Sequence, residues 1–468
     1  MSGRRAHVAI VGSGPAGAYA AIQLLADGGG RVAIDLYDRL ATPWGLVRAG
    51  VAPDHPKIKT VTRVFERLAG DPAFRFVGNV EIGRDVDPQQ LARHYDAVLY
   101  AVGAAGDRRL GIPGEELPGS HPATAFVAWY NGHPDHADDV FDLSARRAVV
   151  VGNGNVALDC ARMLALTPAE LAATDTADHA LAALADSAVE EIVVLGRRGP
   201  LQAAFTNPEL RELVDLADAQ VVVDPEELAL DPASAALLAD GGADTTAVKN
   251  LELLRAYAQA PPNGKRRRIV LRFGVSPVEL VGREGRVAGV RVVRNELTSD
   301  GRGGVAARPT DRVETIDAGL VLRAVGYRGT PLPGVPFDAR RATIHNAGGR
   351  VTDPASGAPL PGLYTAGWVK RGPSGVIGTN KKCAQETVAL LLEDLAAGRL
   401  PARDVEPDAL LAQLRDAGVR VVDFDGWRAI DAHERGLGEP HGRPRVKLVR
   451  RDEQLAHAGA AIPSHTEA

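Results

Sequence analysis

A glycine-rich segment near the start of the chain has the spacing that places a phosphate group against backbone N–H groups. It is the run Gly12-Ser-Gly14-Pro-Ala16-Gly17, which follows an apolar stretch beginning at Val8 and precedes alanines and leucines at helical spacing. The pattern predicts a strand, a tight turn and a helix. Gly12 permits the turn, Gly14 lets a pyrophosphate approach the backbone, and Gly17 lets the helix lie close on the strand.

The same arrangement occurs a second time, in Gly152-Asn153-Gly154-Asn155-Val156-Ala157 after the apolar run 148–151. The second strand of the first copy, residues 32–37, ends at Asp38, whose carboxylate suits the hydroxyl groups of a free ribose. The corresponding strand of the second copy, residues 192–195, ends in Arg197 and Arg198, whose guanidinium groups suit a 2′-phosphate. We therefore expect two different dinucleotides, with NADP at the second copy.

Composition excludes several classes of protein. The 468 residues are too many for one ordinary domain, and a net charge of −5 argues against a general nucleic-acid binder. No apolar run approaches the roughly 20 residues that would span a bilayer, and the N-terminus runs directly into the first strand, so we expect a cytoplasmic protein without membrane association. The two cysteines, Cys160 and Cys383, form no CxxC pair, which argues against a disulfide framework, a thiolate-ligated iron–sulfur cluster and a CxxC redox pair. Cys160 is predicted as a core residue, and no metal site is expected.

Other segments are less regular. Prolines and glycines in residues 42–57 predict a loop, on which Trp44 and His55 either line a ligand or lie at the surface. A strand at 362–365 leads into a third glycine-rich turn and a helix, an arrangement that resembles the one in two-nucleotide flavoproteins and would aim the helix N-terminus at a flavin. The basic run 265–268 predicts a solvated face. Residues after 396 predict a short helix, a strand-like stretch at 419–422 and a polar tail, with no function evident.

Taken in order, these segments resemble the adrenodoxin-reductase-like family of ferredoxin:NADP reductases. The resemblance rests on the motifs Thr42-Pro-Trp-Gly-Leu-Val-Arg48, Gly50-Val-Ala-Pro-Asp-His-Pro-Lys57, Gly152-Asn-Gly-Asn-Val-Ala-Leu-Asp159, Gly196-Arg-Arg-Gly-Pro-Leu-Gln202 and Gly367-Trp-Val-Lys-Arg-Gly-Pro-Ser-Gly-Val-Ile377. It implies an α/β fold with two Rossmann-like dinucleotide-binding domains, the NADP domain (107–325) inserted into an FAD domain (1–106 and 326–395). A C-terminal extension (396–468) has no role implied.

The resemblance also implies the residues of both sites. Together with the first glycine motif, it gives an FAD set that consists of Gly12, Gly14, Ala16, Gly17, Asp38, Trp44, Leu46, Ile82, Gly367, Trp368, Gly375, Val376 and Ile377. The NADP set consists of Arg108, Asn153, Gly154, Asn155, Val156, Arg197, Arg198, Glu209 and Gly375. His55 and Asp159 are implied as the residues that manage a proton or orient the nicotinamide. The family has Glu where this chain has Asp38, which shortens the reach to the ribose.

The implied activity is transfer of a hydride from NADPH C4 to flavin N5, followed by single-electron transfer to a ferredoxin, in a monomer. A small acidic ferredoxin would dock at Arg211, Lys249 and Arg255 on the NADP domain, with the basic run 265–268 as a further candidate for steering it. Three alternatives remain open at this point. A redox sensor would bind both nucleotides without turnover, a flavin monooxygenase would need a pocket for an organic substrate, and a glutamate synthase flavoprotein subunit would carry N-terminal cysteine clusters, which this chain lacks.

Overall fold

The computed structural model describes residues 4–300 and 304–459 and divides the chain into two compact units. The first unit contains the N-terminal residues up to 106, the short segment 131–137 and all residues from 327 onward. The second unit contains residues 107–130 and 138–326. The chain therefore passes from the first unit to the second and returns, and the segment 131–137 is a separate excursion back into the first unit.

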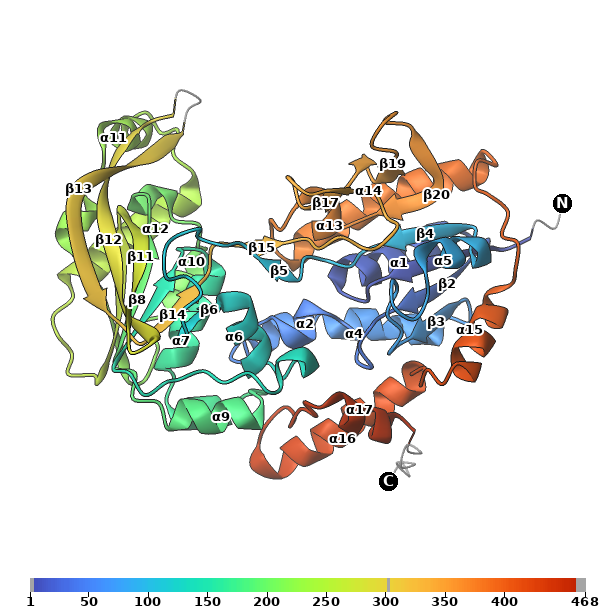
Figure 1. The fold of residues 1–468 in the computed structure, drawn as a ribbon, viewed down its shortest axis with the longest axis horizontal. Coiled ribbons are helices and arrows are strands. Elements are labelled where there is room, and N and C mark those ends of the chain that lie inside the picture. Colours follow the sequence, from blue (N-terminus) through green and yellow to red (C-terminus); the bar gives the residue numbers. More distant parts are fainter. Residues whose placement is uncertain (1–3, 301–303, 460–468) are drawn as a thin grey trace. The chain divides into compact units, whose positions relative to one another are not determined.

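The first unit is built on a seven-stranded sheet with the order β18-β19-β20-β4-β1-β2-β3 (Figure 1). Its strands from β20 to β3 are parallel, and β18 and β19 are antiparallel additions at one edge. The strands are β1 (Ala6–Val11), β2 (Val32–Tyr37), β3 (Phe74–Val77), β4 (Ala97–Tyr100), β18 (Asn346–Ala347), β19 (Arg350–Thr352) and β20 (Pro359–Thr365). Four further short strands are β5 (Gly106–Asp107), β15 (Tyr327–Arg328), β16 (Phe337–Asp338) and β17 (Thr343–Ile344).

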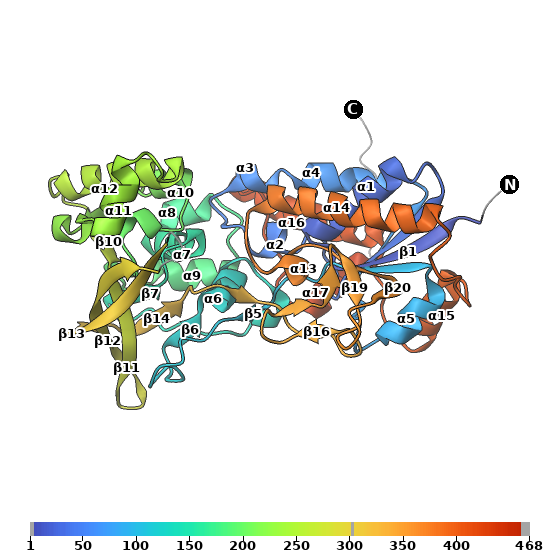
Figure 2. The same ribbon diagram turned by 90° about the horizontal axis from the view of Figure 1, so that it is seen from above.

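Helices cover both faces of this sheet, and Figure 2 shows α1 beside α14. The α-helices are α1 (Pro15–Asp27), α2 (Leu46–Ala49), α3 (Pro56–Lys59), α4 (Thr62–Phe65), α5 (Pro88–His94), α13 (Trp368–Arg371), α14 (Ile377–Ala396), α15 (Pro407–Asp416), α16 (Phe424–Gly438) and α17 (Arg451–Ala458). Three 3-10 turns are η1 (Glu66–Gly70), η2 (Pro134–His136) and η5 (Glu439–His441).

Alternating side chains of the strands form two separate apolar cores, as the period of a strand requires. Val8 and Ile10 of β1 pack with α1, α14 and α16 on one face, whereas Ala9 and Val11 pack with α5 and α15 on the other. Both cores include side chains from beyond residue 396, such as Trp427 of α16. The C-terminal extension is thus part of the first unit.

The second unit is built on a six-stranded parallel sheet with the order β6-β14-β7-β8-β10-β9. Its strands are β6 (Ser120–Pro122), β7 (Arg147–Val151), β8 (Glu191–Gly196), β9 (Ala219–Val223), β10 (Arg267–Phe273) and β14 (Leu320–Arg323). A three-stranded antiparallel sheet is added from β11 (Val275–Arg283), β12 (Arg286–Ser299) and β13 (Val305–Asp317).

One face of the parallel sheet carries helices and the other carries the antiparallel sheet. Val150 and Val194 pack against helices, and Val149 and Val193 pack against β11 and β12. Cys160 of α7 lies fully buried in the helical core, and burial raises the pKa of its thiol well above the usual value, as expected for a core residue. The helices are α6 (Ala123–Tyr130), α7 (Asn155–Ala165), α8 (Pro168–Ala172), α9 (Asp178–Ala185), η3 (Pro200–Gln202), α10 (Asn207–Glu212), η4 (Pro225–Leu228), α11 (Pro232–Ala239) and α12 (Thr245–Gln259).

Three local expectations were wrong. Residues 42–57 are not loop throughout, because the one-turn helices α2 and α3 begin within them. The basic run 265–268 is not simply solvated, because Arg267 is buried and donates to the carbonyl oxygens of Ala165, Leu166 and Val189. Residues 423–459 are not a polar tail, because α16 and α17 form a helix pair there (Figure 1).

Candidate nucleotide-binding sites

The first glycine turn is tightly packed on its protein side and open on the other. A Cβ at Gly17 would lie 1.9 Å from the carbonyl oxygen of Gly12, and a Cβ at Gly12, whose φ is +105°, would lie 2.5 Å from the carbonyl oxygen of Ala101 at the end of β4. A Cβ at Gly14 would meet no atom closer than the Cα of Gly45, at 3.9 Å. The turn thus brings helix α1 onto the sheet and leaves a space over Gly14 that a phosphate fits.

The helices that follow the two glycine turns lack the caps found on other helices of the chain. Thr167 caps α8, Asp231 caps α11 and Asp244 caps α12 through side-chain hydrogen bonds to backbone N–H groups. In contrast, α1 begins after Gly14 and α7 after Gly154, and neither glycine can provide a side-chain cap. The N–H groups of these two first turns are therefore left for an anionic ligand.

Asp38 lies at the end of β2, where the ribose of the first nucleotide is expected. One of its carboxylate oxygens accepts hydrogen bonds from the backbone N–H and the hydroxyl of Ser13, and the other accepts the N–H of Leu40 at 2.9 Å. Since a carboxylate offers about four acceptor positions, a ribose hydroxyl would share the group with Ser13. Asp38 therefore also fixes the glycine turn, a role that its position in the sequence did not reveal.

The expected flavin loop contacts the same turn. Gly45 has a φ of +49°, and a Cβ there would lie 2.9 Å from the Cα of Gly14. The backbone N–H of Trp44 donates to the Ser13 hydroxyl at 3.3 Å, while its indole ring is buried against Phe65. Leu46 is partly exposed at the start of α2. The backbone of Trp44 and the side chain of Leu46 are thus the parts of this loop available to a ligand.

The third glycine turn reaches the first one from the far end of the chain. Gly367 has a φ of +77°, and a Cβ there would lie 2.6 Å from the Cβ of Ala16. The indole N–H of Trp368 donates to the carbonyl oxygen of Ser374 at 3.2 Å, and its ring lies 5.1 Å from that of Tyr327. The structure therefore brings together two segments of the predicted FAD set that are some 350 residues apart.

The remaining members of that set have different surroundings. Gly375 has a φ of +78°, and Val376 is exposed immediately before Ile377 begins α14. The N–H of Val376 donates to the hydroxyl of Thr379 at 3.2 Å. Ile82 is buried in the apolar core on one face of the sheet, so only its backbone is available to a ligand.

The second glycine turn repeats the geometry of the first. A Cβ at Gly152, whose φ is +133°, would lie 2.3 Å from the carbonyl oxygen of Ala324, whereas a Cβ at Gly154 would meet nothing closer than 4.0 Å. The side chain of Asn153 lies against Gly196. The side-chain oxygen of Asn155 accepts the N–H of Thr206 at 2.8 Å, which places the start of α10 beside that of α7. Asn155 thus positions α10, and Val156 follows it in the first turn of α7.

Arg197 and Arg198 follow the carboxyl end of β8. Among residues 4–300 and 304–459, neither guanidinium group has a hydrogen-bond or ion-pair partner, although most arginines nearby are paired. The carbonyl oxygen of Arg197 accepts from the side chain of Asn295 at 2.8 Å, and that of Arg198 accepts the N–H of Gly274 at 3.0 Å. The backbone of this arginine pair is therefore fixed while its charges remain available to an anion.

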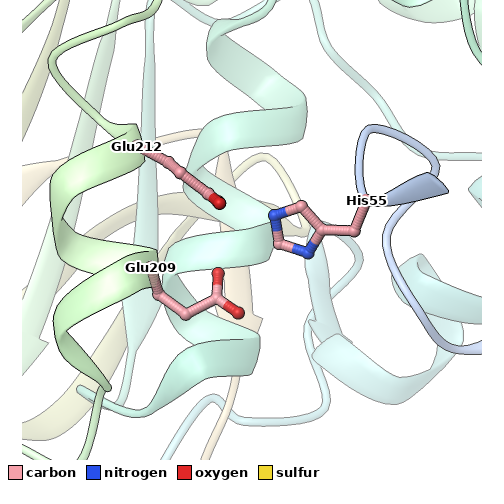
Figure 3. A group of neighbouring side chains, drawn as sticks. All are labelled: His55, Glu209 and Glu212. Atoms are coloured by element: carbon pink, nitrogen blue, oxygen red, sulfur yellow. The ribbon is translucent and has the colours of Figure 1, made fainter. Parts of the chain in front are cut away.

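The buried Arg162 of α7 joins α7 to α10 near the expected position of the nicotinamide. The guanidinium of Arg162 is 2% exposed and lies 2.7 Å from the carboxylate of Asp159, 3.2 Å from that of Glu209 and 3.8 Å from that of Glu212. Glu209 and Glu212 project from the same side of α10 (Figure 3). Sequence reasoning named Asp159 and Glu209 but missed Arg162, whose signal was a cation inside the apolar pattern of α7.

His55 and Arg108 belong to connecting segments. His55 immediately precedes α3 in the first unit, and its backbone N–H donates to the carbonyl oxygen of Ala52 at 3.0 Å. Arg108 is exposed in the second unit, and its N–H donates to the carbonyl oxygen of Gly326 at 3.1 Å.

Comparison with known proteins agrees with this arrangement. Residues 6–195 match the family described as pyridine nucleotide-disulphide oxidoreductase. The NADPH-ferredoxin reductase FprA of Mycobacterium leprae is 50% identical over 96% of this chain and 97% of its own length. The NADPH:adrenodoxin oxidoreductase of Arabidopsis thaliana is 41% identical over 98% and 96% of the two chains. The structure of Mycobacterium tuberculosis FprA in complex with NADPH is 49% identical, covers 97% of this chain and all of that one, and superposes with a TM-score of 0.91.

The fold and the two glycine turns define a flavoprotein oxidoreductase with two Rossmann-like nucleotide-binding domains, which confirms the predicted α/β class. FAD and NADP(H) are its cofactor and co-substrate. Within this class, the chain belongs to the adrenodoxin-reductase-like NADPH-ferredoxin reductase family, as the resemblance implied. This family favours a reductase over the sensor, monooxygenase and glutamate synthase alternatives. In the described part of the chain, no helix has the length and apolar character to cross a membrane.

Proposed function

We propose that the first and third glycine turns hold FAD, that the second turn holds NADPH, and that the enzyme reduces a small acidic ferredoxin. The unpartnered guanidinium pair of Arg197 and Arg198 is the observation that supports this assignment best. Two fixed cations beside an uncapped helix favour a nucleotide with a 2′-phosphate, whereas Asp38 at the first turn favours a free ribose.

When bound, the flavin accepts a hydride from NADPH and releases electrons one at a time, which matches a one-electron partner. The chain itself supplies binding and orientation. Gly14 and the first turn of α1 receive the pyrophosphate of one nucleotide, and Gly154 and the first turn of α7 receive that of the other. Asp159 and Glu209, held by Arg162, orient the nicotinamide end of NADPH.

Reduction by the two nicotinamide nucleotides tests this assignment. Anaerobic stopped-flow absorbance would follow bleaching of the flavin by NADPH and by NADH in the natural protein and in Arg198→Ala. One charge-assisted hydrogen bond contributes about 1.5 to 3 kcal/mol, so the variant should lose roughly 10- to 100-fold in NADPH affinity while NADH is unaffected. An unchanged preference for NADPH would contradict the assignment of the arginines.

The proposed ferredoxin surface consists of Arg211 on α10 and Lys249 and Arg255 on α12. All three are exposed, and in the described ranges their charged groups have no ion-pair partner. Asn207 at the start of α10 donates to the side chain of Asn250 on α12 at 2.6 Å, so the two helices are held together. Because the positive charges on this pair are not neutralised, they suit electrostatic steering of an acidic protein.

The basic run 265–268 is less suited to that role. Arg266 pairs with Asp218, Arg268 pairs with Glu191, and Arg267 is buried. Reduction of cytochrome c through ferredoxin should therefore slow with rising ionic strength, and Lys249→Gln should reduce that dependence more than Arg266→Gln. A rate independent of salt would contradict the steering proposal, and failure of ferredoxin to reoxidise the reduced flavin would contradict the proposed function itself.

A further inference from the structure

The loop that covers the first glycine turn has an unfavourable backbone conformation. Trp44 has a φ of +82°, in the left-handed region that a residue with a large side chain rarely adopts, and Gly45 follows with a φ of +49°. A backbone of this kind persists only where the surrounding structure fixes it. The position of the loop over Gly14 therefore depends on contacts made elsewhere in the unit.

Besides Ser13 and Phe65, the C-terminal extension supplies such contacts. The ring of Phe424, at the start of α16, lies 6.1 Å from the ring of Trp44. The guanidinium of Arg48 lies 5.3 Å from the centre of the Trp427 ring, and the ammonium group of Lys447 donates to the carbonyl oxygen of Arg48 at 3.3 Å. The loop is thus contacted by side chains that follow it by almost 400 residues.

Glu434 is the centre of this contact. Its carboxylate is fully buried and accepts hydrogen bonds from both terminal nitrogens of Arg48, at 2.8 and 2.5 Å. It also receives Arg445 at 3.2 Å and the backbone N–H of Leu448 at 2.9 Å. A bidentate ion pair of this kind fixes the orientation of the guanidinium as well as its distance from the carboxylate. Water does not screen the attraction between the two charges, because the carboxylate is buried.

We infer that Glu434 is a positioning residue for flavin binding, and that the segment 424–448 acts as a brace for residues 44–48. The brace holds the guanidinium of Arg48, Arg48 fixes helix α2, and α2 sets the place of Leu46 and of the Trp44 backbone beside Gly14. This inference rests on the proposed assignment of the first glycine turn to FAD. It gives the C-terminal extension a role that its sequence did not indicate.

The test uses the full-length holoenzyme and the variant Glu434→Gln, which keeps the size of the side chain and removes its charge. We expect FAD to dissociate at least about tenfold faster, because removing one partner of a buried ion pair leaves the other charge uncompensated. Release is followed by the rise in flavin fluorescence after dilution. The dissociation constant of NADP⁺, whose proposed site lies in the second unit, should stay within about twofold of its value in the natural protein. That result would exclude general misfolding.

Glu439→Gln is the matched control, because Glu439 is exposed in the turn that follows α16. It should release FAD at the natural rate. If Glu434→Gln does not fold, Arg48→Lys carries the test, since lysine keeps the charge but cannot form the two-pronged contact. It should raise the rate of FAD release while the far-UV circular dichroism stays unchanged.

Two results would overturn the inference. One is a natural rate of FAD release in a folded Glu434→Gln or Arg48→Lys protein, even if its melting temperature falls, because the pair would then be structural only. The other is equal release from Glu434→Gln and Glu439→Gln. Failure of the proposed function is distinguishable, because the natural protein itself would then bind no FAD or would not be reduced by NADPH.

Discussion

Gly367 and Ala16 lie so close that a single added carbon at Gly367 would stand 2.6 Å from the Cβ of Ala16. One residue begins the third glycine turn and the other lies in the first turn of α1. This contact fixes how the two segments meet beyond the carboxyl ends of the neighbouring parallel strands β1, β4 and β20. The proposed flavin site therefore depends on a close backbone approach that only glycine allows.

The first prediction concerns this contact. Gly367→Ala should lower FAD affinity about tenfold or more, since the overlap forces the third turn away from α1 and the backbone of Gly367, with φ +77° and ψ −149°, adds about 1 to 3 kcal/mol of strain. The ratio of flavin to protein in the purified enzyme and the rate of FAD release measure it. Gly398→Ala is the control, because Gly398 has a φ of +67° but no atom within 4 Å of the added Cβ. Equal FAD loss in both variants would show that strain, and not overlap, is responsible.

The second prediction concerns the carbonyl oxygen of Arg197, which accepts a hydrogen bond from the side chain of Asn295. Asn295→Ala removes the donor to the Arg197 carbonyl, and the loss of a part-buried hydrogen bond of this kind costs about 0.5 to 1.5 kcal/mol. We expect the dissociation constant of NADP⁺ to rise about tenfold while that of NAD⁺ changes little, as measured by titration calorimetry. Ser276→Ala is the control, because Ser276 contacts the same amide of Asn295 but not Arg197. An unchanged ratio of the two affinities would contradict the positioning role.

The third prediction concerns Arg162. Arg162→Met should destabilise the second unit by about 3 kcal/mol or more, because it removes the buried guanidinium that contacts the carboxylates of both Asp159 and Glu209. Urea unfolding followed by circular dichroism measures the loss. Arg211→Met, an exposed change on α10, should alter stability by less than about 0.5 kcal/mol. Equal stability of the two variants would show that the buried cation does not hold the helices together.

The fourth prediction concerns pH. Burial lowers the pKa of His133 to about 4, with Asp135 acting in the opposite direction and Arg39 in the same one. Its neutral ring accepts the N–H of Asp135 at 3.1 Å. Because the folded-state pKa lies below the unfolded value near 6.5, the unfolded chain binds the proton first. This residue's contribution to stability is full above pH 6.5 and is lost as the pH falls toward 4.

Between pH 7.5 and 5.5 the contribution of His133 should fall by about 1 kcal/mol. His133→Asn keeps an acceptor for the N–H of Asp135 and removes the titratable ring. The free energy of unfolding of the natural protein, minus that of the variant, should therefore fall by about 1 kcal/mol between pH 7.5 and 5.5. The urea midpoint at the two pH values measures it. A parallel decline in both proteins would show that His133 does not titrate as described.

The strands and both glycine turns could be predicted from the sequence because each depends on neighbours in the chain. Apolar runs such as 8–11 and 148–151 form strands, and glycine is required where a Cβ would overlap a carbonyl oxygen, as at Gly12 and Gly152. The contrast between Asp38 and the arginine pair is equally local, since each follows directly from a strand. The motifs that carried the resemblance therefore lie within single segments, and similarity over 96% of the chain confirmed the family.

What lies beyond single segments was decided by the tertiary structure. The indole of Trp44 is buried against Phe65, and its orientation depends on Phe424, which is 380 positions away and gave no signal of a shared site. The contact of Arg162 with Glu209 of α10 and that of Glu434 with Arg48 of α2 join different elements, so neither could be predicted from the helix that carries the residue. A charged side chain can be buried only where partners from distant parts of the chain neutralise it, whereas the backbone conformation of a turn depends on residues that are adjacent in sequence. For that reason the sequence determined where the glycine turns lie, and only the folded structure decided which distant side chains pack against them.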